Sequence, residues 1–318
     1  MRSPTQRELG AGDVAAYARA AFGDGVTVAD CAELSGGGFA AVWRARLSDG
    51  RDVVLKVGPP DDVPLLRYEA GMIESEARYF RLVEQQAPLV PVPRVLHHGD
   101  GWLFTTLLPG RALTDLDGPQ DGVREQLGAA LAAVHEVTGD RFGYPGPRPH
   151  GASWSTAFAA MVDALLADAE DWAVPLPVPA ARIRAVVASY ADVLDQVTRP
   201  TLVHFDLWDG NVLAVDGRLT GVVDGERYLY GDPLVDFVSP ALPHRIEDEP
   251  DHPFVRGYAR ATGRPAGFDR SEQRRLALYR LYLYLLMHVE VPSRAIDDQG
   301  RVDFVARLLA EEADLLAA

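Results

Sequence analysis

Several residue types are nearly absent from this chain of 318 residues. Cys31 is its only cysteine, which excludes an internal disulfide framework and a zinc site built from cysteines. No run of apolar residues approaches the roughly 18 that a membrane-spanning helix needs. The first residues, from Met1 to Gln6, lack the apolar core of a signal peptide. We therefore expect no membrane partner and a cytoplasmic location.

Basic residues are also scarce. The chain has 31 Lys and Arg against 46 Asp and Glu, which gives a net charge of −15. Bulk binding of nucleic acid normally requires a basic face, so we expect no nucleic-acid partner. The excess of acid weakly favours a cationic small ligand, although it also serves solubility alone. The length and an apolar content of 47% predict a globular chain of about two domains.

Lysine and asparagine each occur once. Lys56 is the only lysine, since the other 30 basic residues are arginine, and Asn211 is the only asparagine. The heavy use of Arg and Ala is typical of a GC-rich coding sequence. Against that background, Lys56 and Asn211 are candidates for chemistry that Arg, Asp or Ser would not supply.

Two regions differ in their predicted secondary structure. A helix over 13–22 precedes a mostly antiparallel sheet with one long helix, about 68–84, and strands over 26–34, 40–47, 52–57, 92–96 and 102–107. Asp49-Gly50 predicts a tight hairpin. After Leu108-Pro109-Gly110 the pattern is mainly helical, about 121–137, 154–171, 180–196, 253–262, 271–290 and 301–316, with a strand-rich insertion over 201–226. The chain is therefore divided into 1–107 and 108–318.

Glycines lie between the first two predicted strands, in the segment Ser35-Gly36-Gly37-Gly38. Such backbone can approach a phosphate closely and present its N–H groups, although a plain hairpin turn is equally compatible. The segment is not a P-loop, because the motif with its lysine is missing. A strand follows the glycines instead of a helix, which also excludes the dinucleotide-binding fingerprint.

Lys56 lies inside the apolar strand predicted over 52–57. A buried lysine is costly unless it is paired, and a carboxylate on the following helix is the expected partner. Glu76 shares the apolar helical stripe with Ile73 and Phe80. Glu74 lies off that stripe, where it can pair with Arg78. We therefore predict a pair between Lys56 and Glu76.

The most informative segment is His204-Phe205-Asp206-Leu207-Trp208-Asp209-Gly210-Asn211. It places a carboxylate and an amide five residues apart between two apolar runs, and Asp224 ends the next apolar run. The oxygens of Asn211 and Asp224 are the hard ligands that Mg²⁺ prefers. Asp206 is then free to accept a proton from an attacking hydroxyl.

Together these motifs resemble the protein-kinase-like fold, and within it the aminoglycoside phosphotransferase and choline kinase family. That family's loop reads H-G-D-x-H-P-G-N and is followed by a strand such as I-D-W-E. Gly231-Asp232-Pro233-Leu234-Val235-Asp236 is similar to its G-D-P-x-x-D segment, and Leu108-Pro109-Gly110 to its linker. The resemblance covers about 30 to 290. It implies an α+β, two-lobed fold with a small antiparallel-sheet N-lobe and a larger, mainly helical C-lobe.

The resemblance implies a small-molecule kinase that moves the γ-phosphoryl group of ATP or GTP to a hydroxyl. The glycine loop would cover the phosphates, and Lys56, held by Glu76, would bind them. Asn211 and Asp224 would hold Mg²⁺, and Asp206 would act as base. The backbone at Thr106 and Leu108 would contact the purine. Asp236 would brace the catalytic loop.

The acceptor is less well defined. Phe205 replaces the family's Gly, and Trp208-Asp209 replaces His-Pro, next to where an acceptor would bind. Asp209-Gly210 favours a turn over a metal site. Candidate acceptor-binding acids are Asp209, Glu247, Asp248 and Glu249. An aminoglycoside or other cationic antibiotic, in a resistance role, is one acceptor class. The alternatives are a kinase of primary metabolism acting on an amino sugar or choline-like amine, and a nucleotide-binding pseudoenzyme.

Overall fold

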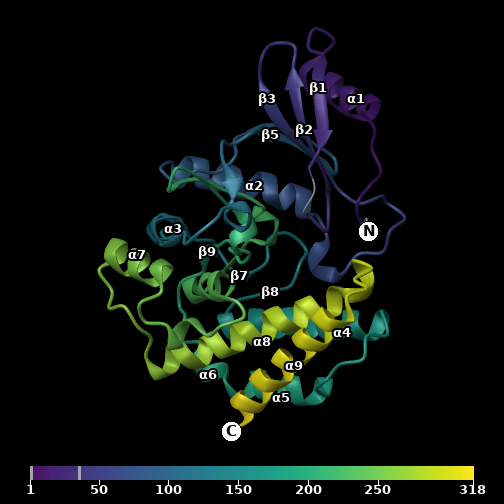
Figure 1. The fold of residues 1–318 in the computed structure, drawn as a ribbon. Coiled ribbons are helices and arrows are strands. Elements are labelled where there is room, and N and C mark those ends of the chain that lie inside the picture. Colours follow the sequence, from purple (N-terminus) through teal and green to yellow (C-terminus); the bar gives the residue numbers. More distant parts are fainter. Residues whose placement is uncertain (1–2, 35–36) are drawn as a thin grey trace.

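The computed structural model describes residues 3–34 and 37–318 (Figure 1). Its helices are α1 (Ala11–Phe22), α2 (Met72–Gln86), α3 (Asp121–Val134), α4 (Trp154–Asp171), α5 (Ala180–Ser189), α6 (Ala191–Leu194), α7 (Pro253–Thr262), α8 (Arg270–Ser293) and α9 (Gln299–Ala317). Its strands are β1 (Val28–Glu33), β2 (Ala41–Leu47), β3 (Asp52–Val57), β4 (Val95–Gly99), β5 (Trp102–Thr106), β6 (Arg111–Ala112), β7 (Phe142–Gly143), β8 (His150–Gly151), β9 (Thr201–Val203), β10 (Val212–Val215), β11 (Arg218–Val222) and β12 (Leu229–Gly231).

The N-terminal sheet has five antiparallel strands in the order β1-β2-β3-β5-β4. Alternate residues of β3 point to opposite faces of this sheet. Val53 and Leu55 pack in one apolar cluster with α1 residues such as Val14. Lys56 is opposite Leu103 of β5, which belongs to the other cluster, formed with α2. The strand therefore presents its lysine toward α2.

Helix α2 begins at Met72, later than predicted. A 3₁₀ turn, Arg67–Glu69, and the left-handed Gly71 (φ 69°) precede it. A single-sequence pattern does not distinguish such a turn from the first turn of a helix. The predicted stripe is confirmed, because Ile73, Glu76 and Phe80 are all buried. The predicted pairing of Glu74 with Arg78 is replaced by a hydrogen bond of 3.0 Å from the Gly101 amide to Glu74.

The C-terminal region combines two small sheets with helices. One sheet has the order β11-β10-β6 and the other β8-β7-β12-β9. Helices α4, α8 and α9 lie at the end of the molecule away from the five-stranded sheet (Figure 1). The helix predicted over 180–196 is divided between α5 and α6 at Tyr190, whose φ is −107°. The small antiparallel sheet and the larger helical region together confirm the predicted α+β, two-lobed fold class.

None of the helices among the described residues is both long and apolar enough to span a bilayer.

Candidate active site

Lys56 connects the sheet to both neighbouring regions. Its Nζ donates to Glu76 Oε1 of α2 at 2.7 Å and also contacts Asp224, which follows β11. The predicted pair between Lys56 and Glu76 is therefore confirmed. Glu76 is fully buried, whereas 35% of the Asp224 side chain is exposed. The open side of this ion pair is consequently the Asp224 side.

Burial and charge oppose each other at this cluster. Burial favours a neutral Lys56, yet the carboxylates of Asp224 and Glu76 outweigh it and raise the pKa of the ammonium. Burial raises the pKa of Glu76. It would also raise that of Asp224, but contact with Lys56 lowers the pKa of Asp224 instead. The lysine is thus held charged, and its charge is shared between two carboxylates.

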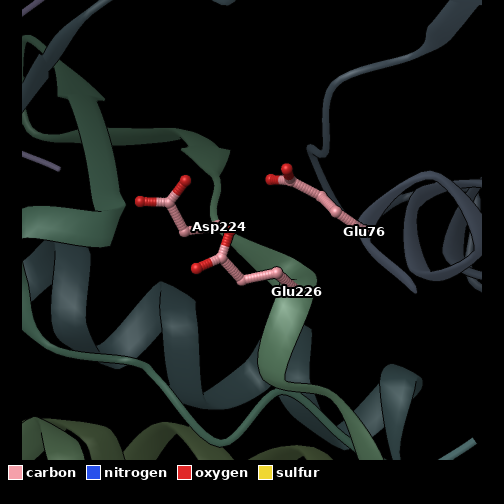
Figure 2. Close-up of side chains that lie close together, drawn as sticks. All are labelled: Glu76, Asp224 and Glu226. Carbon is pink, nitrogen blue, oxygen red and sulfur yellow. The ribbon is translucent and has the colours of Figure 1, made fainter. Parts of the chain in front are cut away.

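A third carboxylate, Glu226, completes the cluster. One oxygen each of Glu76, Asp224 and Glu226 lies within 4.8 Å of the others, and Figure 2 shows the three side chains converging from α2 and from the segment after β11. Burial raises the pKa of Glu226. We did not select Glu226 from the sequence, although its place two residues after Asp224, in a pattern matching I-D-W-E, was a usable signal.

The loop that carries Asp206 is held in place by Asp236. The carboxylate of Asp236 accepts hydrogen bonds from the amides of His204 (2.9 Å) and Phe205 (2.6 Å) and contacts His135 Nε2 at 3.0 Å. The His204 ring lies 2.9 Å from the carbonyl of Val223, next to Asp224. Asp236 therefore braces this loop, as the resemblance implied.

Phe205 occupies the left-handed region, with φ 72°. Such a conformation costs a residue with a side chain about 1–2 kcal/mol, which is why glycine suits this position. Here the side chain is buried and its ring centroid lies 5.6 Å from that of Tyr282. The apolar contact offsets the backbone strain. Trp208, the other departure from the family loop, is 44% exposed.

Asp206 lies three residues before the 3₁₀ turn Asp209–Asn211, which ends at Asn211. Asn211 Nδ2 donates to the carbonyl of Asp206 at 2.9 Å, and the Val223 amide donates to the Asn211 carbonyl at 3.0 Å. That second bond places Asn211 beside the residue preceding Asp224. Burial raises the pKa of Asp206 to about 6, although Arg227 acts against the shift. The structure thus brings the predicted base and both predicted metal ligands together.

The glycine loop is tied down by distant segments. Ser35 and Gly36 lie outside the described residues. The Gly37 carbonyl accepts from Gln6 at 2.7 Å, and the Gly38 carbonyl accepts from Thr5 at 2.8 Å and from Arg294, after α8, at 3.3 Å. Gly37 and Gly38 are exposed. Their carbonyls face protein, which leaves amides as the groups available to a ligand.

The predicted purine-contacting segment follows β5. The Thr106 amide donates to the Arg94 carbonyl at 2.9 Å, and the Leu107 amide to that of Asp52 at 3.3 Å. A purine contact by Thr106 would therefore use its carbonyl. The Leu108 side chain lies against Gly221, where an added Cβ would be 2.8 Å from it.

The acids proposed for the acceptor differ in their partners and burial, although Asp209 and Glu249 both lie near enough to His252 to act on its pKa. Asp209 lies in a 3₁₀ turn and pairs with Arg124 of α3, so the predicted turn is confirmed. Both oxygens of Glu247 accept from Arg280 of α8, at 2.6 and 2.7 Å, and an acceptor role for Glu247 stays a prediction. Asp248 is exposed and Glu249 half-buried. An acceptor role for Asp248 and Glu249 stays a prediction.

The geometry agrees with comparisons to known proteins. The family described as "Phosphotransferase enzyme family" matches residues 30–276, which is more than half of the chain. The chain belongs to this family. The predicted enzyme class, a small-molecule phosphotransferase, is thereby confirmed. A "Probable ketoamine kinase" from Lactiplantibacillus plantarum is 27% identical over 271 residues, or 81% of this chain and 87% of that protein.

Solved structures share the fold. A putative fructosamine-3-kinase from Thermobifida fusca superposes with a TM-score of 0.70 at 23% identity, covering 95% of this chain and 100% of that one. The gentamicin-APH(2")-IIa complex superposes with a TM-score of 0.65 at 16% identity, covering 96% of this chain and 97% of that one. The streptomycin-ATP-APH(2")-IIa ternary complex superposes with a TM-score of 0.62 at 16% identity, covering 98% of this chain and 99% of that one.

Proposed function

We propose that the protein is an ATP-dependent kinase that phosphorylates a hydroxyl of a small, sugar-derived ketoamine. The observation that carries the transfer reaction is the placement of Asp206 next to the ion pairs of Lys56, Glu76 and Asp224. This arrangement supplies a cation for the phosphates and a carboxylate for the acceptor proton. The reaction is proposed for the cytoplasm, where ATP is available.

A magnesium ion fits the carboxylate cluster. One lysine faces three carboxylates, and the buried Glu76 Oε2 has no hydrogen-bond partner among the described residues. Such an arrangement holds more negative charge than its own cation balances. Asp224 and Asn211 would hold the ion, with Glu226 as a further oxygen donor. When bound, Mg²⁺ neutralises charge on the phosphates.

The protein's own residues carry out the remaining steps. Lys56 binds the α- and β-phosphates, and Glu76 keeps its ammonium in place. Asp206 orients the acceptor hydroxyl and takes its proton. The exposed Gly37 and Gly38 amides cover the phosphates. Carbonyl and amide groups at Thr106 and Leu108 hold the purine.

We infer that nucleotide binding and acceptor binding each belong to one continuous part of the chain. Residues 1–107 form the nucleotide-binding lobe, and residues 108–318 the catalytic and acceptor-binding lobe. The strand β6, at Arg111–Ala112, supports this boundary because it pairs with β10 and not with the N-terminal sheet. Lys56 and Asp224 then meet across the boundary.

A ketoamine acceptor is supported by the name of the Lactiplantibacillus plantarum relative. An aminoglycoside is the second candidate, since aminoglycoside phosphotransferases share the fold. A resistance role would follow only from that second candidate.

The test is a coupled assay of ADP release with Mg²⁺ and either ATP or GTP. Acceptors are hexose-derived ketoamines, free amino sugars, aminoglycosides and choline-like amines, with the Asp206→Asn protein as control for contaminating kinases. We expect ketoamine-dependent ADP release that this control lacks. Activity with aminoglycosides alone would replace the proposed acceptor. Nucleotide binding without transfer to any acceptor would support the pseudoenzyme alternative.

A further inference from the structure

Arg227 lies beside Asp206 and was not selected from the sequence. It belongs to the 3₁₀ turn Gly225–Arg227 and directly follows Glu226 of the carboxylate cluster. Its Nη2 donates to Glu290 of α8 at 2.7 Å, and its Nε lies 3.9 Å from Asp206 Oδ2. The guanidinium therefore stands between a buried structural carboxylate and the proposed catalytic one.

Only one side of this guanidinium is satisfied. Among the described residues Arg227 donates a hydrogen bond only through Nη2, and its Nε is buried without a partner. A separation of 3.9 Å is too long for a hydrogen bond to Asp206. The side chain is 15% exposed and Nε is buried, so Nη1 is the donor left for a ligand. Unused donors at a polar site indicate a missing acceptor of hydrogen bonds.

Glu290 is suited to hold Arg227 in this position. Its carboxylate also accepts from Tyr68 and lies 3.6 Å from Arg294. Burial would raise the pKa of Glu290, but Arg227 and Arg294 outweigh it and keep the carboxyl ionised. The charge that faces Arg227 is therefore fixed, and the orientation of the planar guanidinium is fixed with it.

The reaction creates a specific electrostatic problem at this position. The Asp206 carboxylate must approach an oxygen that is gaining a bond to an anionic phosphoryl group. The loop from His204 to Asn211 contains no lysine or arginine that could offset the repulsion. Lys56 is already shared between Glu76 and Asp224. A cation beside Asp206 would act on the acceptor side of the phosphoryl group, where such charge is most effective.

We propose that Arg227 is a further catalytic residue, whose unused donors contact the phosphoryl group during transfer. This inference rests on the proposed function. As the acceptor oxygen bonds to the γ-phosphorus, the bond from that phosphorus to the β,γ-bridging oxygen breaks. The acceptor proton passes to Asp206, and ADP leaves. Glu290 is a positioning residue that acts through Arg227.

The test uses aluminium fluoride with Mg-ADP as a mimic of the phosphoryl group in transit. The melting temperature is measured with Mg-ADP alone and after addition of aluminium fluoride, for the native protein, Arg227→Met and Arg227→Lys. We expect Arg227→Met to keep the response to Mg-ADP and to lose the additional response to aluminium fluoride. Arg275→Met is the matched control, because Arg275 is also buried and pairs with Asp232 at 2.8 Å.

A second measurement uses water as the acceptor. ADP release from Mg-ATP should fall at least about tenfold in Arg227→Met with little change in KM for ATP, since transition-state arginines contribute about 10³-fold or more in other phosphoryl-transfer enzymes. Arg227→Lys should restore part of the rate of ADP release. The double variant Arg227→Met/Glu290→Gln removes both charges of the pair, so it does not leave the Glu290 charge without Arg227. It replaces Arg227→Met in both measurements if that single variant does not fold.

The outcomes separate this inference from the proposed function. A native protein that neither binds Mg-ADP nor releases ADP from Mg-ATP contradicts the proposed function. If the native protein releases ADP and Arg227→Met releases it equally fast, the role of Arg227 is contradicted and the proposed function is not. Equal loss of the responses to Mg-ADP and to aluminium fluoride would assign Arg227 a structural role only and overturn the inference. If the native protein does not respond to aluminium fluoride, ADP release decides.

Discussion

Two clusters of buried charge in this molecule differ in their balance. In the C-terminal region, Arg280 pairs with Glu247 and Glu312, and Arg245 pairs with Glu312 at 2.9 Å. Two cations therefore face two carboxylates. Between α2 and β11, Lys56 alone faces Glu76, Asp224 and Glu226. The first cluster balances its cations and carboxylates, whereas in the second three carboxyl groups face one lysine, and burial raises the pKa of Glu76 and Glu226.

The difference separates a structural cluster from a binding site. A set of charges that balances itself needs no further cation, although the buried Glu312 Oε2 has no hydrogen-bond partner among the described residues. An excess of buried carboxylate is unfavourable unless a cation joins it or a carboxyl group takes up a proton. The excess of carboxyl groups in the second cluster is the observation that supports the cation proposed for it. Changes within each cluster should therefore have opposite consequences for stability and for activity.

The largest effect is expected at Asp206, which borders the unbalanced cluster. Asp206→Asn should slow phosphoryl transfer by about 10²–10⁴-fold, the usual contribution of a general base. Nucleotide affinity should stay close to that of the native protein, because Asp206 faces the acceptor. Turnover and ATP binding measured on the same preparation test this, and near-native turnover would contradict the assignment.

Lys56→Arg should have the next largest effect. Lysine has a compact ammonium, whereas arginine has a wide planar group. The space between Glu76 and Asp224 admits one nitrogen that contacts both, so a guanidinium would push α2 away. We expect kcat/KM for ATP to fall at least tenfold, a loss of roughly 1.4 kcal/mol of transition-state stabilisation. Melting temperature serves as the control, and a fully active, equally stable variant would refute this geometry.

One matched pair of substitutions tests the comparison directly. Glu247→Gln removes a charge from the balanced cluster and should lower the free energy of unfolding by about 1–3 kcal/mol. Glu226→Gln relieves repulsion in the unbalanced cluster and should raise it by about 1 kcal/mol in metal-free buffer. Denaturant unfolding with and without Mg²⁺ measures both. Destabilisation of similar size by the two changes would show that the clusters do not differ in kind.

The smallest effect concerns pH. The pKa of Asp206 is raised to about 6, and the carboxylate must be ionised to accept a proton. Activity at pH 6 should therefore be about half of its value at pH 8, and should fall further in more acid solution. The pH dependence of kcat/KM reports this ionisation in the free enzyme. A rate that is constant down to pH 5 would exclude Asp206 as the titrating base.

The long elements were predictable from the sequence because their patterns are strong. Strand β3 was predicted with its observed bounds, and α4 and α7 likewise. The apolar stripe of α2 was sufficient to identify Glu76 as the partner of Lys56. The start of α2 was less predictable, because the buried Glu69 pairs with Arg294, far along the chain. No local pattern contains that contact.

The site was predictable where the motif itself holds the chemistry. Asp206, Asn211 and Asp224 lie on one short stretch of chain whose spacing is informative. Arg227 was not, because its position depends on Glu290, 63 residues away. The partner of Glu247 was not predictable for the same kind of reason, since Arg280 lies on a different element. Contacts between distant charged residues decide which acids remain available to a ligand.

The single lysine also makes the folded chain resistant to amine-directed chemical labelling. Only 13% of the Lys56 side chain is exposed, and two carboxylates raise the pKa of its ammonium. Reagents that acylate amines require the neutral form, so they should modify Lys56 only when the chain opens. Apart from the α-amine, the sequence offers them no other amine. A mass increase at this one residue would therefore count unfolding events, molecule by molecule, without any engineered probe.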